Sequence, residues 1–136
     1  MEYIQLKIES PLPEISHLKP FRAVVIVEEE VTEEWQVQVS EWLVKSGCLY
    51  MMAWGKECSS WDDSVDMANL KVSGVEDIQE EEFVMTTWHE NEPLNEVFWF
   101  SKHNAEHPEV EIRNTLILHI SSQNKCDELV QGYKSA

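Results

Sequence analysis

The chain has 136 residues, the usual size of one domain, and 43% of them are hydrophobic, so it can bury a core without disulfides or metals. Its 26 acidic residues outnumber its 10 basic ones, and the formal net charge of −16 repels phosphate backbones and anionic lipid headgroups. The charge therefore argues against direct binding to nucleic acid or membranes. It is compatible with a basic protein partner, or simply with solubility.

The cysteines and the first residues indicate a cytoplasmic protein. Cys48, Cys58 and Cys126 are odd in number and form no C-x-x-C motif, so neither a disulfide framework nor a zinc knuckle is indicated. The opening segment MEYIQLKIES has neither the basic start nor the apolar run of a signal peptide. We also find no stretch that reaches the ~20 apolar residues of a membrane span.

The first 20 residues predict an edge strand followed by a proline-rich lead-in. Apolar and polar side chains alternate over residues 3–8, which is typical of a half-exposed strand.

Phe21–Val27 is an apolar, largely β-branched run of the kind that parallel sheets bury on both faces. Thr32 as N-cap, and apolar residues at helical spacing up to Gly47, predict the first helix.

The middle of the chain predicts two more strands around a second helix. Residues 48–54 form a continuous apolar strand, and Ser60 followed by Asp63 resembles a capping box that begins a helix ending near Leu70. Residues 71–82 are predicted to be a loop, and residues 83–89 a third core strand.

The last third of the chain predicts a third helix, a fourth core strand and a short final helix. Pro93 suits the first position of a helix, and Pro108 marks where that helix ends. Residues 115–120 predict the strand, and residues 124–133 the C-terminal helix.

This alternation predicts one α/β domain over residues 1–136. We expect a three-layer doubly wound fold, Rossmann-like or flavodoxin-like, with a mostly parallel sheet, an added N-terminal edge strand, a core over 21–120 and a tail or helix over 121–136. Ligands of such folds bind beyond the carboxyl ends of the strands, near a switch in strand order. The order itself does not follow from the sequence.

The loops at that edge carry carboxylates and one histidine. Glu28 follows the first core strand, Asp62 and Asp63 lie at the start of the second helix, and His89 and Glu90 follow the third core strand. If these loops converge, a cleft of carboxylates around one imidazole suits a divalent cation or acid/base catalysis. The alternative is a set of solvated loops, because a chain with 26 acidic residues places several at any edge by chance.

The segment from residue 55 to residue 63 combines a glycine, a cation, hydroxyls and a helix start, which together can hold an anion. Asp62 and Asp63 favour a capped helix start instead, since they already complement the helix dipole. Neither G-x-x-x-x-G-K-[ST] nor G-x-G-x-x-G occurs, so we predict no cofactor and no resident metal. The candidate binding residues of these loops are Trp54, Gly55, Lys56, Ser59, Ser60, Trp61 and Glu92.

For three other features we prefer a structural interpretation to a functional one. His103 and His107 match the H-x-x-E-H string of inverted zinc proteases, but Pro108 follows at once and the chain has no room for the further ligand helix. Cys58 near a helix start can be a nucleophile, although most cysteines are inert thiols. His119 alternates within an apolar strand and is expected to be a satisfied sheet histidine.

The third helix suggests an interface, because Trp99 and Phe100 remain after its core-facing side is filled. Two outcomes stay open. Either the protein forms a symmetric dimer through these residues, or one of them packs under the N-terminal strand or the C-terminal tail.

Residues 48–70, 83–100 and 115–121 together resemble a family of short bacterial proteins of unassigned function, some of them carried as mobile gene cassettes. The resemblance covers most of the chain and implies no catalytic residue.

Two functions follow as hypotheses, and the sequence leaves open whether the protein is an enzyme. The first is a non-catalytic, immunity-type accessory protein that engages a partner through its acidic surface and exposed aromatic side chains. The second is a small hydrolase or glycosyl-transferring enzyme with carboxylates and a histidine at the carboxyl edge of the sheet.

Overall fold

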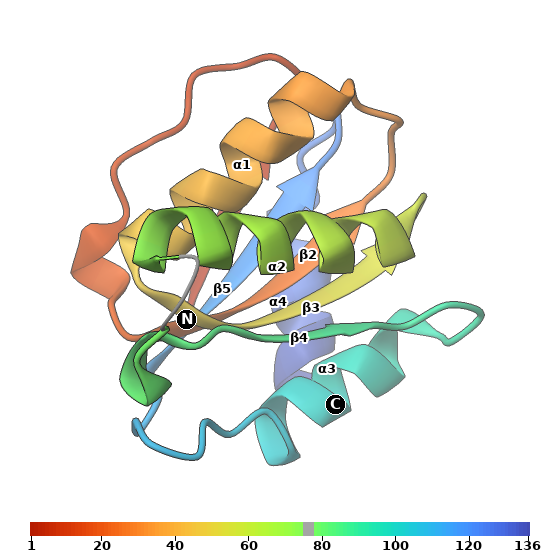
Figure 1. Ribbon diagram of the computed structural model, residues 1–136. Coiled ribbons are helices and arrows are strands. Elements are labelled where there is room, and N and C mark those ends of the chain that lie inside the picture. Colours follow the sequence, from red (N-terminus) through yellow and green to blue (C-terminus); the bar gives the residue numbers. More distant parts are fainter. Residues whose placement is uncertain (75–77) are drawn as a thin grey trace.

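The computed structural model describes residues 1–74 and 78–136 (Figure 1). Within these residues the chain forms a parallel sheet with strand order β1-β5-β2-β3-β4. The strands are β1 (Glu2–Leu6), β2 (Phe21–Val27), β3 (Cys48–Gly55), β4 (Met85–Trp88) and β5 (Asn114–Ile120). The helices are α1 (Glu33–Ser46), α2 (Cys58–Ser73), α3 (Leu94–His103) and α4 (Cys126–Ser135).

The helices cover both faces of the sheet, which confirms the predicted doubly wound α/β fold (Figure 1). On one face, Trp35 and Leu43 of α1 and Val65 of α2 pack against the sheet. On the other, Phe98 of α3 and Tyr133 of α4 pack against it, with ring centroids 5.3 Å apart. The N-terminal strand β1 lies at the sheet edge beside β5, as the sequence predicts.

Strand order switches at β2. From β2 the chain winds outward through α1, β3 and α2 to β4, and then returns by α3 to place β5 on the other side of β2. The loops after β2 and β5 therefore leave the sheet towards different faces, at the position where such folds bind ligands.

The second helix differs from its prediction at both ends. It begins at Cys58 rather than at Ser60, because the Ser60 hydroxyl donates to the carbonyl of Glu57 at 2.6 Å instead of capping the helix. It continues to Ser73, so the predicted loop over 71–82 is shorter than expected and contains a turn of 3-10 helix at Glu80–Glu82. Residues 75–77 of that loop lie outside the described residues.

Strand β4, which follows α2, is shorter than predicted. The Asn69 side chain forms hydrogen bonds with backbone groups that a longer strand would pair with its neighbour. The Asn69 amide accepts from the backbone N–H of Val84 at 2.9 Å and donates to the carbonyl of Glu82 at 3.0 Å. These bonds hold the entry to β4 against α2, so the strand begins only at Met85.

The third helix ends at His103, well before Pro108. The helix ends where the backbone N–H groups of Asn104 and Ala105 both donate to the carbonyl of Phe100, at 2.8 and 3.1 Å. After it, the Nδ1 atom of the buried His107 accepts from the backbone N–H groups of Glu109 and Val110, both at 3.1 Å, and Nε2 donates to the carbonyl of Phe83 at 2.8 Å. Both ring nitrogens of His107 are therefore used in shaping a turn.

A glycine closes the turn after β3. Gly55 has φ +104°, and an added Cβ would lie 2.1 Å from the carbonyl oxygen of Val27, which accepts from the backbone N–H of Lys56 at 2.8 Å. We predict that Gly55→Ala lowers the free energy of unfolding by about 2–4 kcal/mol, measured by urea denaturation.

Gly132→Ala in α4 is the matched control for that substitution. Its Cβ would meet Phe98 at an ordinary 3.4 Å, and alanine favours a helix, so we expect unchanged or slightly increased stability. Equal losses in the two variants would contradict the assigned strain at Gly55.

Candidate functional site

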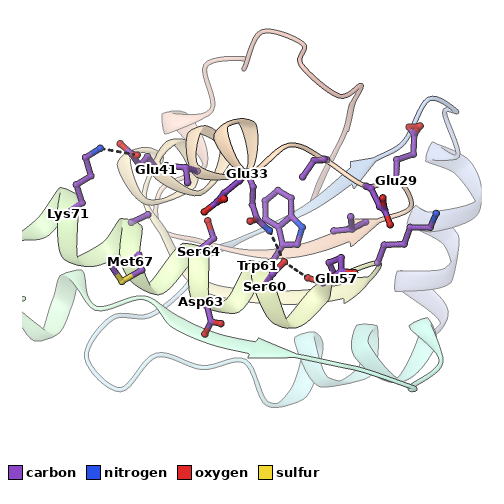
Figure 2. Close-up of a pocket in the computed structure, with 17 residues that line it drawn as sticks. Glu29, Glu33, Glu41, Glu57, Ser60, Trp61, Asp63, Ser64, Met67 and Lys71 are labelled. Carbon is purple, nitrogen blue, oxygen red and sulfur yellow. Dashed lines mark hydrogen bonds and ion pairs between the residues drawn. The ribbon is translucent and has the colours of Figure 1, made fainter.

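A groove of about 740 Å³ lies between α1 and α2, at the carboxyl ends of β2 and β3 (Figure 2). Small polar side chains hold the two helices together beneath it. Gln36 donates to the Ser60 hydroxyl at 2.9 Å, and the Ser40 and Ser64 hydroxyls lie 2.8 Å apart. The groove is thus framed by two well-fastened helices and by the loops that follow β2 and β3.

Negative charge dominates the lining of this groove. Its two lysines are Lys56 and Lys71, and Lys71 is already paired with Glu41 at 3.3 Å. Exposed apolar surface accompanies the charge, since Val37 is 41% exposed and Met67 is 65% exposed. The acidic residues of the lining are Glu29, Glu30, Glu33, Glu41, Glu57 and Asp63.

The candidate binding residues of the Gly55 loop fall into separate places. Lys56, Ser60 and Trp61 line the groove, whereas Ser59 is exposed outside its lining. The Trp54 indole points elsewhere, because its Nε1 donates to the carbonyl of Glu92 at 2.7 Å. The sequence marks this loop as a candidate binding segment, but it does not separate the residues that line the groove from their neighbours.

The structure does not form the carboxylate cleft around His89, which is one of the two alternatives that the sequence leaves open. His89 is buried against Phe100, with ring centroids 5.1 Å apart, and its Nδ1 lies 2.9 Å from the Glu92 carboxylate. Asp63 lines the α1–α2 groove, and Glu28 bonds a different histidine. The helix that His89 packs on, α3, covers the opposite face of the sheet from α2, so the predicted members cannot converge.

The remaining candidates supply no alternative centre. Asp62 is buried in α2, and its Oδ1 has no hydrogen-bond partner within the described residues, while Glu90 is exposed. Burial raises the pKa of the Cys58 thiol, and the Glu90 carboxylate adds to the rise, so the thiol stays protonated. Within 1–74 and 78–136, no group of three or more His, Cys, Asp or Glu side chains is placed to hold a metal ion.

The two aromatic candidates on α3 differ in their surroundings. Phe100 packs within the chain, against Tyr50 and His89, with centroid distances of 6.0 and 5.1 Å. Trp99 is 51% exposed, so it remains available to a second surface. Self-association through Trp99 stays a prediction.

At the switch in strand order, four side chains form a hydrogen-bonded cluster that we call the switch-point cluster: Tyr3, Glu28, His119 and Lys125. His119 on β5 is fully buried and is bonded at both ring nitrogens. Its Nδ1 lies 2.7 Å from the Tyr3 hydroxyl, and its Nε2 contacts the Glu28 carboxylate. Lys125 joins through two groups, the backbone N–H donating to Tyr3 at 3.1 Å and Nζ donating to Glu28 at 3.3 Å.

Sheet register brings these residues together. Ile26 pairs with His119, and the backbone N–H of Glu28 continues that ladder by donating to the carbonyl of Ile120 at 3.0 Å. Because side chains two residues apart share a face, Glu28 lies on the same face as Ile26 and reaches His119 diagonally. On the other side of β5, Tyr3 pairs with Ile117 and reaches the same histidine.

The hydrogen-bond partners in this cluster indicate which of its atoms carry a proton. Burial pushes the pKa of Glu28 upward, but hydrogen bonds from His119 and Lys125 outweigh it, so the pKa is lowered and the carboxylate is charged. Burial raises the pKa of Tyr3, against the backbone hydrogen bond from Lys125, so the phenol keeps its proton. Tyr3 then donates to Nδ1 and His119 donates from Nε2 to Glu28, which satisfies every member.

The comparison with family profiles decides the relationship of the chain. A family described as a domain of unknown function (DUF7684) matches residues 1–136. The chain belongs to this family. The comparisons with curated proteins and with solved structures found no match. Among the described residues of this DUF7684 protein, none of the helices is both long enough and apolar enough to cross a bilayer.

The charge on Glu28 makes a prediction about acid stability. A carboxylate whose pKa is lowered by folding stabilises the protein above its unfolded pKa, and this contribution disappears as pH falls through the folded pKa. Glu28→Gln should lower the free energy of unfolding at pH 7 by about 1–2 kcal/mol, allowing for a side chain that is one-third exposed. The variant should also lose less stability than the wild type below about pH 5.

Urea denaturation across pH 3–7 measures both effects, with Glu29→Gln as the matched control that leaves the cluster untouched. Parallel pH profiles for the wild type and Glu28→Gln would contradict a charged, bonded Glu28.

Proposed function

We propose that this protein is a binding protein of the immunity or accessory type, and that the α1–α2 groove takes a basic, amphipathic segment of a partner protein. The observation that carries the proposal is the combination in one groove of acidic side chains around exposed apolar surface at Val37 and Met67. A helix with lysine or arginine on one side and apolar residues on the other complements both parts.

Charge supports a basic partner over an anionic one. Six acidic side chains face two lysines in the groove lining, and Lys71 is engaged by Glu41. The chain as a whole carries −16, so approach of a basic segment is accelerated from a distance and approach of an anion is opposed.

Rigidity supports binding without rearrangement. The helices that frame the groove are tied by the Gln36 and Ser60 bond and by the Ser40 and Ser64 bond, and their inner sides are buried in the core. A preformed groove spares a partner the cost of ordering both surfaces.

The test uses a synthetic helical peptide with leucine on one face and lysine on the other, followed by fluorescence anisotropy at low and at physiological salt. We expect the double variant Glu29→Lys with Glu33→Lys to weaken binding about tenfold or more, because two attractions become repulsions.

The matched control is Glu109→Lys with Glu111→Lys, which makes the same change of net charge at exposed positions before β5, away from the groove lining. We expect it to change affinity by less than about threefold. Equal weakening by both double variants would mean that binding of the peptide depends only on the net charge of the protein. That result would contradict binding in the α1–α2 groove.

A further variant examines the apolar surface. Met67→Gln leaves the charge unchanged, and we expect binding several-fold weaker at physiological salt because exposed apolar area is lost. Unchanged affinity in this variant would contradict an amphipathic partner.

A further inference from the structure

The switch-point cluster lies on the face of the sheet that α3 and α4 cover, away from the groove. It joins a phenol, an imidazole and a carboxylate in one line, from Tyr3 on β1 through His119 on β5 to Glu28 after β2. The carboxyl ends of β2 and β5, where strand order switches, are the position at which doubly wound folds place ligands.

The order of these groups is that of an activated nucleophile. Such sites place a hydroxyl or thiol within hydrogen-bond reach of a base, and a third group orients the base. Here the Tyr3 hydroxyl lies 2.7 Å from Nδ1 of His119, and the Glu28 carboxylate holds Nε2.

The protonation states fit the same roles. A phenol that rests protonated within hydrogen-bond distance of an imidazole keeps its proton until it attacks, as a serine does in a hydrolase. The imidazolium that then forms is stabilised by the Glu28 carboxylate, which Lys125 keeps charged and in place.

The other two tyrosines provide an internal comparison. The Tyr133 hydroxyl is bonded to Ser101 at 2.8 Å, and both Tyr133 and Tyr50 are buried. Tyr3 is partly exposed, and of the three its hydroxyl is the one that contacts a histidine among the described residues.

We infer that Tyr3 is a nucleophile activated by His119, that Glu28 is the positioning residue of that histidine, and that the site transfers acyl groups from esters to water. In the first step the Tyr3 oxygen attacks the ester carbonyl, its proton passes to Nδ1 of His119, and the alcohol leaves with that proton. In the second step His119 takes a proton from water, the hydroxide attacks the acyl-tyrosine, and the acid leaves as Tyr3 regains its proton.

Local charge selects the class of substrate. Glu28 stands beside Tyr3, and the first turn of α4 carries Asp127 and Glu128, against the single ammonium group of Lys125. A phosphoryl group would bring two or more negative charges into this surrounding, whereas an uncharged ester brings none. The site therefore suits a neutral acyl donor.

The experiment treats the full chain with p-nitrophenyl acetate. Release of nitrophenolate gives the rate, and peptide mass spectrometry locates the acetyl group, with hydroxylamine removing it from a phenol but not from a lysine. We expect acetylation of Tyr3 at least tenfold faster than acetylation of N-acetyltyrosine amide at the same pH, and no reaction at this position in Tyr3→Phe.

Two variants test the roles of the neighbours. His119→Gln should slow acetylation of Tyr3 tenfold or more. Glu28→Gln should lower the maximal rate of acetylation while leaving the ester concentration for half-maximal rate unchanged, which a change of general packing would not do. Glu111→Gln changes an exposed carboxylate before β5 that belongs to neither proposed site, so it is the matched control and should react like the wild type.

Each result of the acetylation experiment either supports Tyr3 as the nucleophile or overturns that inference. If Tyr3 reacts no faster than the free amide, or if a folded Glu28→Gln reacts at the wild-type rate, the inference is overturned. Circular dichroism checks that each variant is folded, and Glu28→Gln settles the matter should His119→Gln fail to fold. None of these variants alters the α1–α2 groove, so the result is independent of peptide binding.

Discussion

The two-layered helix covering, the α1–α2 groove and the switch-point cluster all depend on the position of β2 between β3 and β5. The strand is buried on both faces, with Val25 packed towards α1 and α2, and Val24 and Ile26 packed towards α3 and α4. Apolar side chains on both faces exclude water from each layer, and parallel pairing on both edges uses the backbone groups of β2. Since the chain winds away from β2 in both directions, the residues that follow it stand where two sets of loops separate.

This placement explains why the fold was predictable. A β-branched run such as Phe21–Val27 has few stable environments other than the middle of a parallel sheet, and short crossovers then require helices on both faces. The first helix was equally clear, because Thr32 caps the backbone N–H of Trp35 at 3.2 Å and Gly47 ends the helix at φ +103°. Local chemistry decides such features, so local sequence reveals them.

The site was less predictable because it depends on strand order and register. The sequence places Glu28 among the acidic residues that follow β2, but it offers His89 as the neighbouring imidazole. His119 looked like a satisfied sheet histidine, and it is satisfied, yet its partners come from β1 and from the end of β2, about 90 or more residues away. Only the pairing of β5 with both strands brings those groups together, and no periodicity within a single segment encodes that pairing.

The two proposed sites share one turn of backbone. Val27 lines the α1–α2 groove, and the next residue, Glu28, bonds His119 on the opposite face. Successive residues of a strand point to opposite faces, so neighbouring residues of the chain belong to the α1–α2 groove and to the switch-point cluster. The same turn is held from both sides, by Lys56 on the carbonyl of Val27 and by Ile120 on the N–H of Glu28. A ligand that shifted the loop after β2 would therefore have to break a bond to β5 or to the Gly55 turn. For that reason we expect the groove and the cluster to act as independent, rigid sites.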